Sequence, residues 1–247
     1  MIRLFEELRK RLIIITVLVF MLAIVSFTFS DLIREVLLRP ANQAYGEYGL
    51  ADGDMLQLIF LTPSEALIAN LRLAFISAAT IALPVILYQV VSMIMNLVGR
   101  TKAAVIVLSL VMYILFALGV SFAYFVVLPF ALSFFIGFSG ADLAPSFSIA
   151  RYISFTATFI FSFGLVFQLP VLFWFLGSVG VVDTPFLRRN RKFALLIIVV
   201  FASILTPPDI FSQVLMAIPL MILYELGIFM VYLARRKKRL EAEQAQA

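Results

Sequence analysis

The segment FEELRKRL, at residues 5–12, is the part of the sequence whose side-chain types and spacing most clearly invite a chemical role. Two carboxylates, Glu6 and Glu7, stand directly before three basic residues and a long apolar run. Basic residues beside an apolar run set the orientation of a membrane segment, but acidic residues contribute little to it. The two acids therefore need an explanation other than topology.

Glu225 is an acidic residue inside an apolar run. It lies about ten residues before Arg235, so a helix places it roughly 15 Å from the basic end of that run. An ionised carboxylate at such a depth costs about 2.5–3.5 kcal/mol, so it must be protonated, paired or in contact with water. Two interpretations stay open: a contact with a substrate or partner in a wet groove, and a structural carboxyl bonded to a neighbouring helix.

Three uncharged polar residues also fall in or beside apolar runs. Gln168 lies two residues before Pro170, and a proline frees a helix carbonyl that a side-chain amide or a water can satisfy. A role as a link between helices and a role in a binding site are both open for Gln168. Thr206 begins the sequence TPPD at an outer turn and Gln213 follows it, and we expect the two to form a polar rim there.

The composition excludes most soluble proteins and most enzymes. Of the 247 residues, 64% are hydrophobic and 13% are charged, against roughly 45–50% and about 25% in soluble domains. Cysteine, histidine and a GxxxxGK loop are all absent from the sequence, which removes the commonest metal ligands, the usual general base and a phosphate cradle. We therefore expect a membrane protein with no enzymatic activity, metal, cofactor or nucleic-acid partner.

The apolar runs predict an all-α integral membrane protein. A helix needs about 20 residues to cross a bilayer core near 30 Å thick. We expect a single membrane domain, residues 1–247, with six spans at about 12–29, 73–99, 103–128, 152–178, 193–205 and 210–233. Because the first run lacks an A-x-A site, we do not expect it to be a cleaved signal peptide. Pro129 is expected to end or bend the third span, and the fifth covers only about 20 Å.

The outer loop, residues 30–65, carries the sequence DLIREVLLRPANQ at 31–43, whose apolar residues follow a helical spacing. An amphipathic helix lying along the outer interface and a loop helix packed on its neighbours are both consistent with this stripe. Prolines within or beside the runs suggest bent helices that form a curved, concave bundle.

The charge distribution predicts the orientation. With six spans both termini lie on one side, and most of the 19 Lys and Arg residues fall on that side, whereas the other side is rich in acids. The positive-inside rule therefore predicts that both termini of this multi-pass protein lie in the cytoplasm.

Seven segments occur in the order and at the spacing typical of one family. They are FEELRKRL (5–12), LPVILYQV (83–90), FAYFVV (122–127), YISF (152–155), FGLVFQLPV (163–171), TPPDIFSQVLMAIP (206–219) and YELGIF (224–229). On these segments the chain resembles the TatC family, the large polytopic subunits of the twin-arginine protein translocase. The resemblance covers essentially the whole chain, and TPPDxFSQ followed by AIP is its most specific part.

The resemblance implies a glove-like, concave bundle of six helices with both ends in the cytoplasm. It implies binding of signal peptides that carry consecutive arginines, and assembly with single-span TatA- and TatB-type subunits in a complex that holds more than one copy of this chain. It further implies export of folded proteins across the cytoplasmic (inner) membrane, driven by the proton-motive force, without nucleotide hydrolysis or other enzymatic activity.

The resemblance also assigns roles to individual residues at the cytoplasmic face. Glu7 corresponds to the family's N-terminal recognition glutamate, and Arg9 to the arginine near it. The second recognition glutamate, in the first cytoplasmic loop, falls on Thr101, so this chain lacks it. An aromatic residue and a proline that usually precede that loop are replaced by Ser92 and Met95.

Within the membrane, a glutamate of the fourth span in many relatives corresponds to Gln168, and an acid of the sixth span corresponds to Glu225. Thr206 and Gln213 match the polar site at which partner subunits dock.

The missing loop glutamate leaves three interpretations open. Carboxylates recognise guanidinium groups best, because the bidentate, charge-assisted pair is strong and directional. Glu6 beside Glu7 is one source of a second carboxylate; acceptance of a relaxed or altered signal is another explanation. The third is a diverged paralogue that leaves recognition to a second TatC subunit.

A secondary transporter of small solutes is a competing class, because it too has broken helices and buried polar groups. Such transporters usually show internal repeats with paired discontinuous segments. The loops and proline positions of the two halves of this chain differ, which argues against that class.

Overall fold

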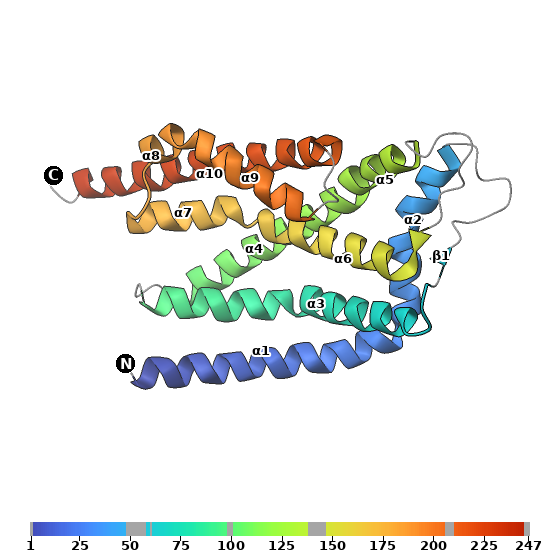
Figure 1. Cartoon of the computed structure of the whole chain (residues 1–247). Helices are drawn as coiled ribbons and strands as arrows, with labels where there is room; N and C mark the ends of the chain where they lie inside the picture. The colour runs from blue at the N-terminus through green and yellow to red at the C-terminus, as the bar shows by residue number, and fades with distance from the viewer. Residues whose placement is uncertain are drawn as a thin grey trace. The chain divides into compact units, whose positions relative to one another are not determined.

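Helices make up nearly all of the chain that the structure, a computed structural model, describes (Figure 1). The described residues are 2–47, 58–59, 61–97, 101–137, 147–205 and 210–244. The elements in chain order are α1 (Ile2–Thr28), α2 (Ser30–Glu47), β1 (Leu58–Ile59), α3 (Glu65–Leu97), α4 (Lys102–Phe122), the π-helical turn η1 (Ala123–Val127), α5 (Leu128–Gly137), β2 (Phe147–Ser148), α6 (Ile149–Val166), α7 (Leu169–Val179), α8 (Thr184–Arg189), α9 (Arg191–Leu205) and α10 (Ile210–Gln244).

Five helical stretches within the described ranges are long and apolar enough to cross a membrane. They are Phe5–Thr28, Glu65–Ile94, Lys102–Gly137, Ile149–Val179 and Met216–Arg236. The predicted all-α membrane class is thereby confirmed. The remaining predicted span matches α9, whose 15 residues reach about 22 Å, short of a core near 30 Å. The six-span count and the side on which the termini lie stay predictions.

The chain divides into two compact units, Met1–Phe161 and Ser162–Ala247. In the first unit α1 lies alongside α3, and α3 packs on α4 (Figure 1). The α3–α4 contact buries Leu83 and Leu87 against Phe116, which meets Phe161 edge to face with ring centroids 5.9 Å apart. By contrast, large apolar side chains such as Phe20 are exposed on α1, as expected for a helix whose solvent is lipid.

In the second unit α7 lies against α10, and glycines set the closeness of that contact. A Cβ atom built on Gly227 of α10 comes within 2.1 Å of the Phe173 ring, and one built on Gly177 of α7 within 3.0 Å of Val231. Small residues let backbones approach closely where lipid offers no hydrophobic drive for association. Helix α7 then ends at Gly180, whose φ of 93° only glycine adopts without strain.

Pro129 does not end its helix, contrary to one of the two outcomes expected from the sequence. The helical path continues from α4 through η1 and α5 to Gly137. In an α-helix the proline ring clashes with the carbonyl one turn earlier. Here the turn directly before Pro129 is π-helical, and the Leu128 N–H donates to the Ala123 carbonyl five residues back. The wider turn makes room for the ring, so the helix reaches well past the predicted end at residue 128.

The amphipathic stripe of the outer loop forms a helix, α2, which extends beyond the stripe and contains Pro40. Because Pro40 has no N–H, the carbonyl of Val36 loses its helical partner. The Tyr124 hydroxyl of η1 donates to that carbonyl at 2.7 Å. The buried Tyr152 hydroxyl of α6 donates to the next carbonyl, that of Leu37, at 2.6 Å. Two tyrosines from different helices thus fasten α2 at its proline.

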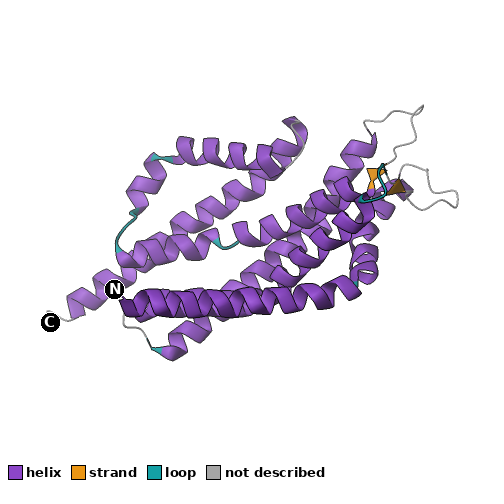
Figure 2. Cartoon of the chain, turned by 60° about the horizontal axis from the view of Figure 1, so that its bottom comes forward, coloured by secondary structure: helices purple, strands orange, loops and turns teal. Residues whose placement is uncertain are grey.

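The two strands in the described part of the chain, which Figure 2 shows beside the helices, are β1 from the outer loop and β2 directly before α6. Strands β1 and β2 pair in parallel, with Leu58 opposite Phe147 and Ile59 opposite Ser148. The pair brings the start of α3 next to the start of α6.

Glu65, the first residue of α3, fixes this junction. Its carboxylate is buried and accepts hydrogen bonds from the N–H groups of Leu61 at 2.6 Å and Thr62 at 3.3 Å. The other oxygen accepts from the Ser148 hydroxyl and from the N–H of Ala150 at 3.3 Å. Thr62 and Glu65 have the capping-box spacing, so a local helix signal also serves a contact between distant segments.

Replacing Tyr152 by phenylalanine is expected to destabilise the protein, because it leaves a buried Leu37 carbonyl without its hydroxyl partner. Loss of one such hydrogen bond costs about 0.5–1.5 kcal/mol. The measurement is the midpoint of thermal unfolding in a mild detergent. Tyr113→Phe is the matched control, since Tyr113 is 40% exposed on α4. Equal midpoints for the two variants would contradict the assigned role of Tyr152.

Candidate functional site

The acids of FEELRKRL lie on a helix, because α1 begins at Ile2 rather than at the start of the apolar run. Residues four apart on a helix face the same side. The Arg11 guanidinium therefore reaches Glu7, and its Nη2 donates to the Glu7 Oε1 at 2.6 Å. One of the two predicted recognition acids is thus already paired with a basic residue of its own helix.

Arg11 also reaches across to α3. Its Nη1 donates to the Gln89 carbonyl at 2.8 Å and to the Gln89 side-chain Oε1 at 3.2 Å. Its Nη2 donates to the Ser92 hydroxyl at 3.3 Å. The Arg11 side chain is 16% exposed, whereas that of Glu7 is 48% exposed. Arg11 is therefore held between the two helices, and Glu7 stands at the open edge of the cluster.

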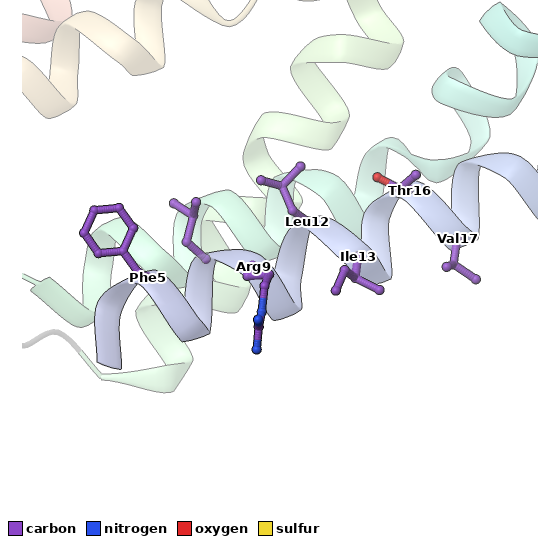
Figure 3. Close-up of a pocket in the computed structure, with 7 residues that line it drawn as sticks. Phe5, Arg9, Leu12, Ile13, Thr16 and Val17 are labelled. Atoms are coloured by element: carbon purple, nitrogen blue, oxygen red, sulfur yellow. The ribbon is translucent and has the colours of Figure 1, made fainter. Parts of the chain in front are cut away.

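Glu6 and Arg9 point away from this cluster. Successive helix residues are about 100° apart, so neither shares the face of Glu7 and Arg11. Both side chains are exposed. Arg9 lines an open pocket formed by α1 alone, in which Figure 3 shows Phe5 and Leu12 projecting to one side and Arg9 to the other. The structure does not bring Glu6 or Arg9 to Glu7.

Thr101 is the residue directly before α4. Its backbone is extended, with φ of −69° and ψ of 152°, and its side chain makes no capping hydrogen bond. The side chain is exposed. Within the described ranges no hydrogen bond joins Thr101 to Glu6 or Glu7. The preceding loop, residues 98–100, lies outside the described residues.

Gln168 stands at a break that the sequence did not predict. The expected span at 152–178 consists of two helices, α6 and α7, separated by a turn at residues 167–168. Pro170 in the first turn of α7 has no N–H for the α6 carbonyls, which explains the interruption. The Gln168 Nε2 donates to the Gly164 carbonyl at 3.3 Å. The amide thus satisfies a carbonyl one turn back, which favours the structural interpretation.

Glu225 is paired with an arginine. Its Oε2 accepts a hydrogen bond from the Arg191 Nη2 at 2.6 Å, and both side chains are nearly half exposed. The neighbouring Tyr224 hydroxyl donates to the Leu187 carbonyl at 2.8 Å. The start of α9 therefore lies at the level of Glu225 along α10. Of the two interpretations, this favours a structural carboxyl bonded to a neighbouring helix.

The basic run after the last span also has structural partners. Arg235 donates to the carbonyls of Gly180 at 3.2 Å and Val182 at 3.1 Å, and pairs with Asp183. A cation at the carboxyl end of α7 is favoured by the helix dipole.

Gln213 ties α10 to α9, because its Nε2 donates to the Val199 carbonyl at 3.0 Å. Thr206, its predicted companion in the outer polar rim, lies outside the described residues. Among the residues that are described, no three His, Cys, Asp or Glu side chains gather in a way that could hold a metal ion.

The site cluster contains three residues that sequence reasoning did not assign to it: Arg11, Gln89 and Ser92. The spacing of Glu7 and Arg11 was a usable signal, since an acid four residues before a base favours a helical ion pair. The bonds to Gln89 and Ser92 join residues about 80 positions apart, and no local pattern encodes them.

Comparison with known proteins gives one consistent result. A family profile described as "Sec-independent protein translocase protein (TatC)" matches residues 3–219. The protein of that name from Aquifex aeolicus is 38% identical over 237 residues, which cover 95% of each chain. The one from Carboxydothermus hydrogenoformans is 35% identical over 235 residues, or 94% of this chain and 93% of that protein.

A solved structure agrees. The crystal structure of a "Twin Arginine Translocase Receptor- TatC" superposes with a TM-score of 0.83 at 36% identity, covering 94% of this chain and 99% of that chain. The helices and these matches define a multi-pass membrane protein of the protein-transport class. The chain belongs to the TatC family of Sec-independent protein translocases. It is a translocase subunit and not an enzyme, and it works within a Tat complex.

The ion pair of α9 and α10 is expected to behave as a unit. Arg191→Gln or Glu225→Gln alone leaves a charge without its partner, so each is expected to lower the thermal midpoint in lipid nanodiscs. The double variant is expected to lie closer to the original protein than the sum of the two losses, by about 0.5–1 kcal/mol for a pair this exposed. Additive losses would mean that the contact at 2.6 Å contributes no coupling.

Proposed function

We propose that this TatC-family chain is the subunit that binds twin-arginine signal peptides, and that Glu7 receives a signal-peptide arginine. The supporting observation is that the half-exposed Glu7 carboxylate already holds one guanidinium, that of Arg11, at 2.6 Å. A carboxylate that accepts one such donor in this position has the chemistry needed for another. Glu6 adds negative charge next to Glu7 along α1. Arg9 and Thr101 are included in the proposed site on the resemblance alone, since neither is bonded to Glu7 within the described residues.

We further propose that the site faces the cytoplasm, in a multi-pass protein of the cytoplasmic membrane with both termini inside. The support is the charge asymmetry: most of the 19 basic residues fall on the side of the chain ends when six spans are assumed. The proton-motive force is then available across the same membrane to drive export of folded cargo, as the resemblance implies.

Partner subunits of the single-span TatA and TatB type are proposed to dock near Thr206, Gln213 and α9, with more than one copy of this chain in the complex. Two features support this. Helix α9 is shorter than a bilayer core, so mismatch favours association with other helices there. The polar Gln213 also lies in this region, linked to α9 through Val199. Gln168 and Glu225 are assigned structural roles inside the membrane, on the contacts described above.

The test is photo-crosslinking of a twin-arginine peptide that carries a photoreactive group beside its arginines. The Glu6→Ala/Glu7→Ala variant is expected to reduce crosslinking about tenfold, because a hydrogen bond to a charged group is worth about 1.5–3 kcal/mol. Asp31→Ala/Glu35→Ala removes the same charge from exposed positions on α2 and is expected to change nothing. Unchanged crosslinking in the Glu6/Glu7 variant would refute the proposed site.

The residue before α4 provides a second test. Thr101→Glu is expected to raise the affinity for twin-arginine peptides by about threefold, since it adds a carboxylate where the loop otherwise carries basic charge. The helix should tolerate the change, because Thr101 makes no capping bond and an acid at a helix start is favourable. The measurement is fluorescence anisotropy with labelled peptide. No gain, or a loss, would favour an altered signal or a paralogue that leaves recognition to a second TatC.

A further inference from the structure

We propose that Arg11 is an internal competitor for the signal-peptide arginine and thereby sets the affinity of the site. This inference rests on the proposed function, since it takes Glu7 as the carboxylate that receives the peptide. It concerns a residue of the chain that contacts Glu7 through its own guanidinium, the same chemical group that the peptide presents.

The geometry of the pair gives the first step. Arg11 contacts Glu7 through one nitrogen, Nη2, and one oxygen, Oε1, at 2.6 Å. A guanidinium binds a carboxylate most strongly when two parallel N–H groups meet both oxygens. An arriving arginine can pair in that way only if Arg11 gives up Oε1 or shares it. Binding is therefore an exchange of one guanidinium for another at the same carboxylate.

The other partners of Arg11 lower the free-energy cost of this exchange. The guanidinium also donates to the Gln89 carbonyl, the Gln89 amide oxygen and the Ser92 hydroxyl, all on α3. An arginine has five N–H donors, so Arg11 keeps these acceptors when Glu7 leaves. The Arg11 guanidinium, whose side chain is only 16% exposed, would lose its paired carboxylate but keep hydrogen-bond acceptors. The cluster can therefore release Glu7 without losing its link to α3.

Electrostatics also predicts that Arg11 lowers the affinity for the peptide. The charge of Arg11 cancels much of the attraction that Glu7 exerts on an approaching cation. The Glu7 side chain, at 48% exposed, is nevertheless the accessible member of the pair. Removing the Arg11 charge should therefore strengthen peptide binding. If Arg11 served only to join α1 to α3, its removal would loosen the site and weaken peptide binding, which is the opposite result.

The experiment measures anisotropy of a labelled twin-arginine peptide with the full chain in nanodiscs. Arg11→Gln is expected to bind about threefold more tightly, the order expected for loss of a half-exposed ion pair. Lys10→Gln removes the same charge from the next, exposed position and is the matched control, expected to leave the affinity within about twofold. In a Glu7→Gln background, Arg11→Gln is expected to give no gain.

Three outcomes would overturn the proposal: unchanged or weaker binding by Arg11→Gln, an equal gain in Lys10→Gln, or a gain that persists without Glu7. If Arg11→Gln does not fold, Arg11→Lys replaces it. Its single ammonium cannot serve Gln89 and Glu7 with separate nitrogens, so a smaller gain is expected, and none or a loss again overturns the proposal.

The failure of this inference can be told apart from failure of the proposed function. If Glu6→Ala/Glu7→Ala abolishes binding but Arg11→Gln brings no gain, only the competitor role of Arg11 is refuted. If the unmodified chain binds a twin-lysine peptide as well as a twin-arginine one and the acid-free variant binds both, the proposed function itself is refuted, and the role of Arg11 with it.

Discussion

The constraint on which this structure depends is that a backbone polar group in lipid must find its partner within the protein. A proline inside a helix removes one such partner, and three of the prolines in this chain are accommodated in different ways. At Pro40 two tyrosine hydroxyls reach the carbonyls of α2. At Pro129 a π-helical turn shifts the hydrogen-bond register. At Pro170 the helix stops, and the amide of Gln168 bonds back to α6. These local arrangements determine where the helices bend, where they end and where they contact one another.

The same constraint explains which parts of the fold could be predicted from the sequence alone. Apolar runs mark what lipid surrounds, so the helical class and most spans were predictable. Helix ends were not, because α1, α3 and α10 extend into polar sequence that a hydropathy argument assigns to loops. The continuation through Pro129 and the break before Pro170 were not predictable either. The same residue type has opposite outcomes there, and the difference lies in the register of the preceding turn.

The candidate site shows the same division. Glu7 was predicted as its acid, on the resemblance to a family, and the structure brings Arg11, Gln89 and Ser92 to it. The orientation rule counts basic residues without distinguishing them. In the folded chain Arg11 joins two helices and Arg235 contacts the carboxyl end of α7. Basic residues that count toward membrane orientation thus also form hydrogen bonds and ion pairs in the folded chain. Only the tertiary structure shows which partners they bind.

Glu7 and Glu225 form two similar ion pairs whose arginines differ in their other partners. Each acid is about half exposed and accepts one arginine N–H at 2.6 Å. Arg11 has further acceptors on α3, so the loss of Glu7 leaves it bonded. For Arg191, Glu225 is the only acceptor that the described residues provide to its guanidinium. Releasing Glu225 therefore leaves the Arg191 guanidinium without a hydrogen-bond acceptor among the described residues, whereas Arg11 keeps its acceptors on α3. The proposed exchange at Glu7 therefore rests on the number of alternative partners of its arginine, and not on the length of the ion pair.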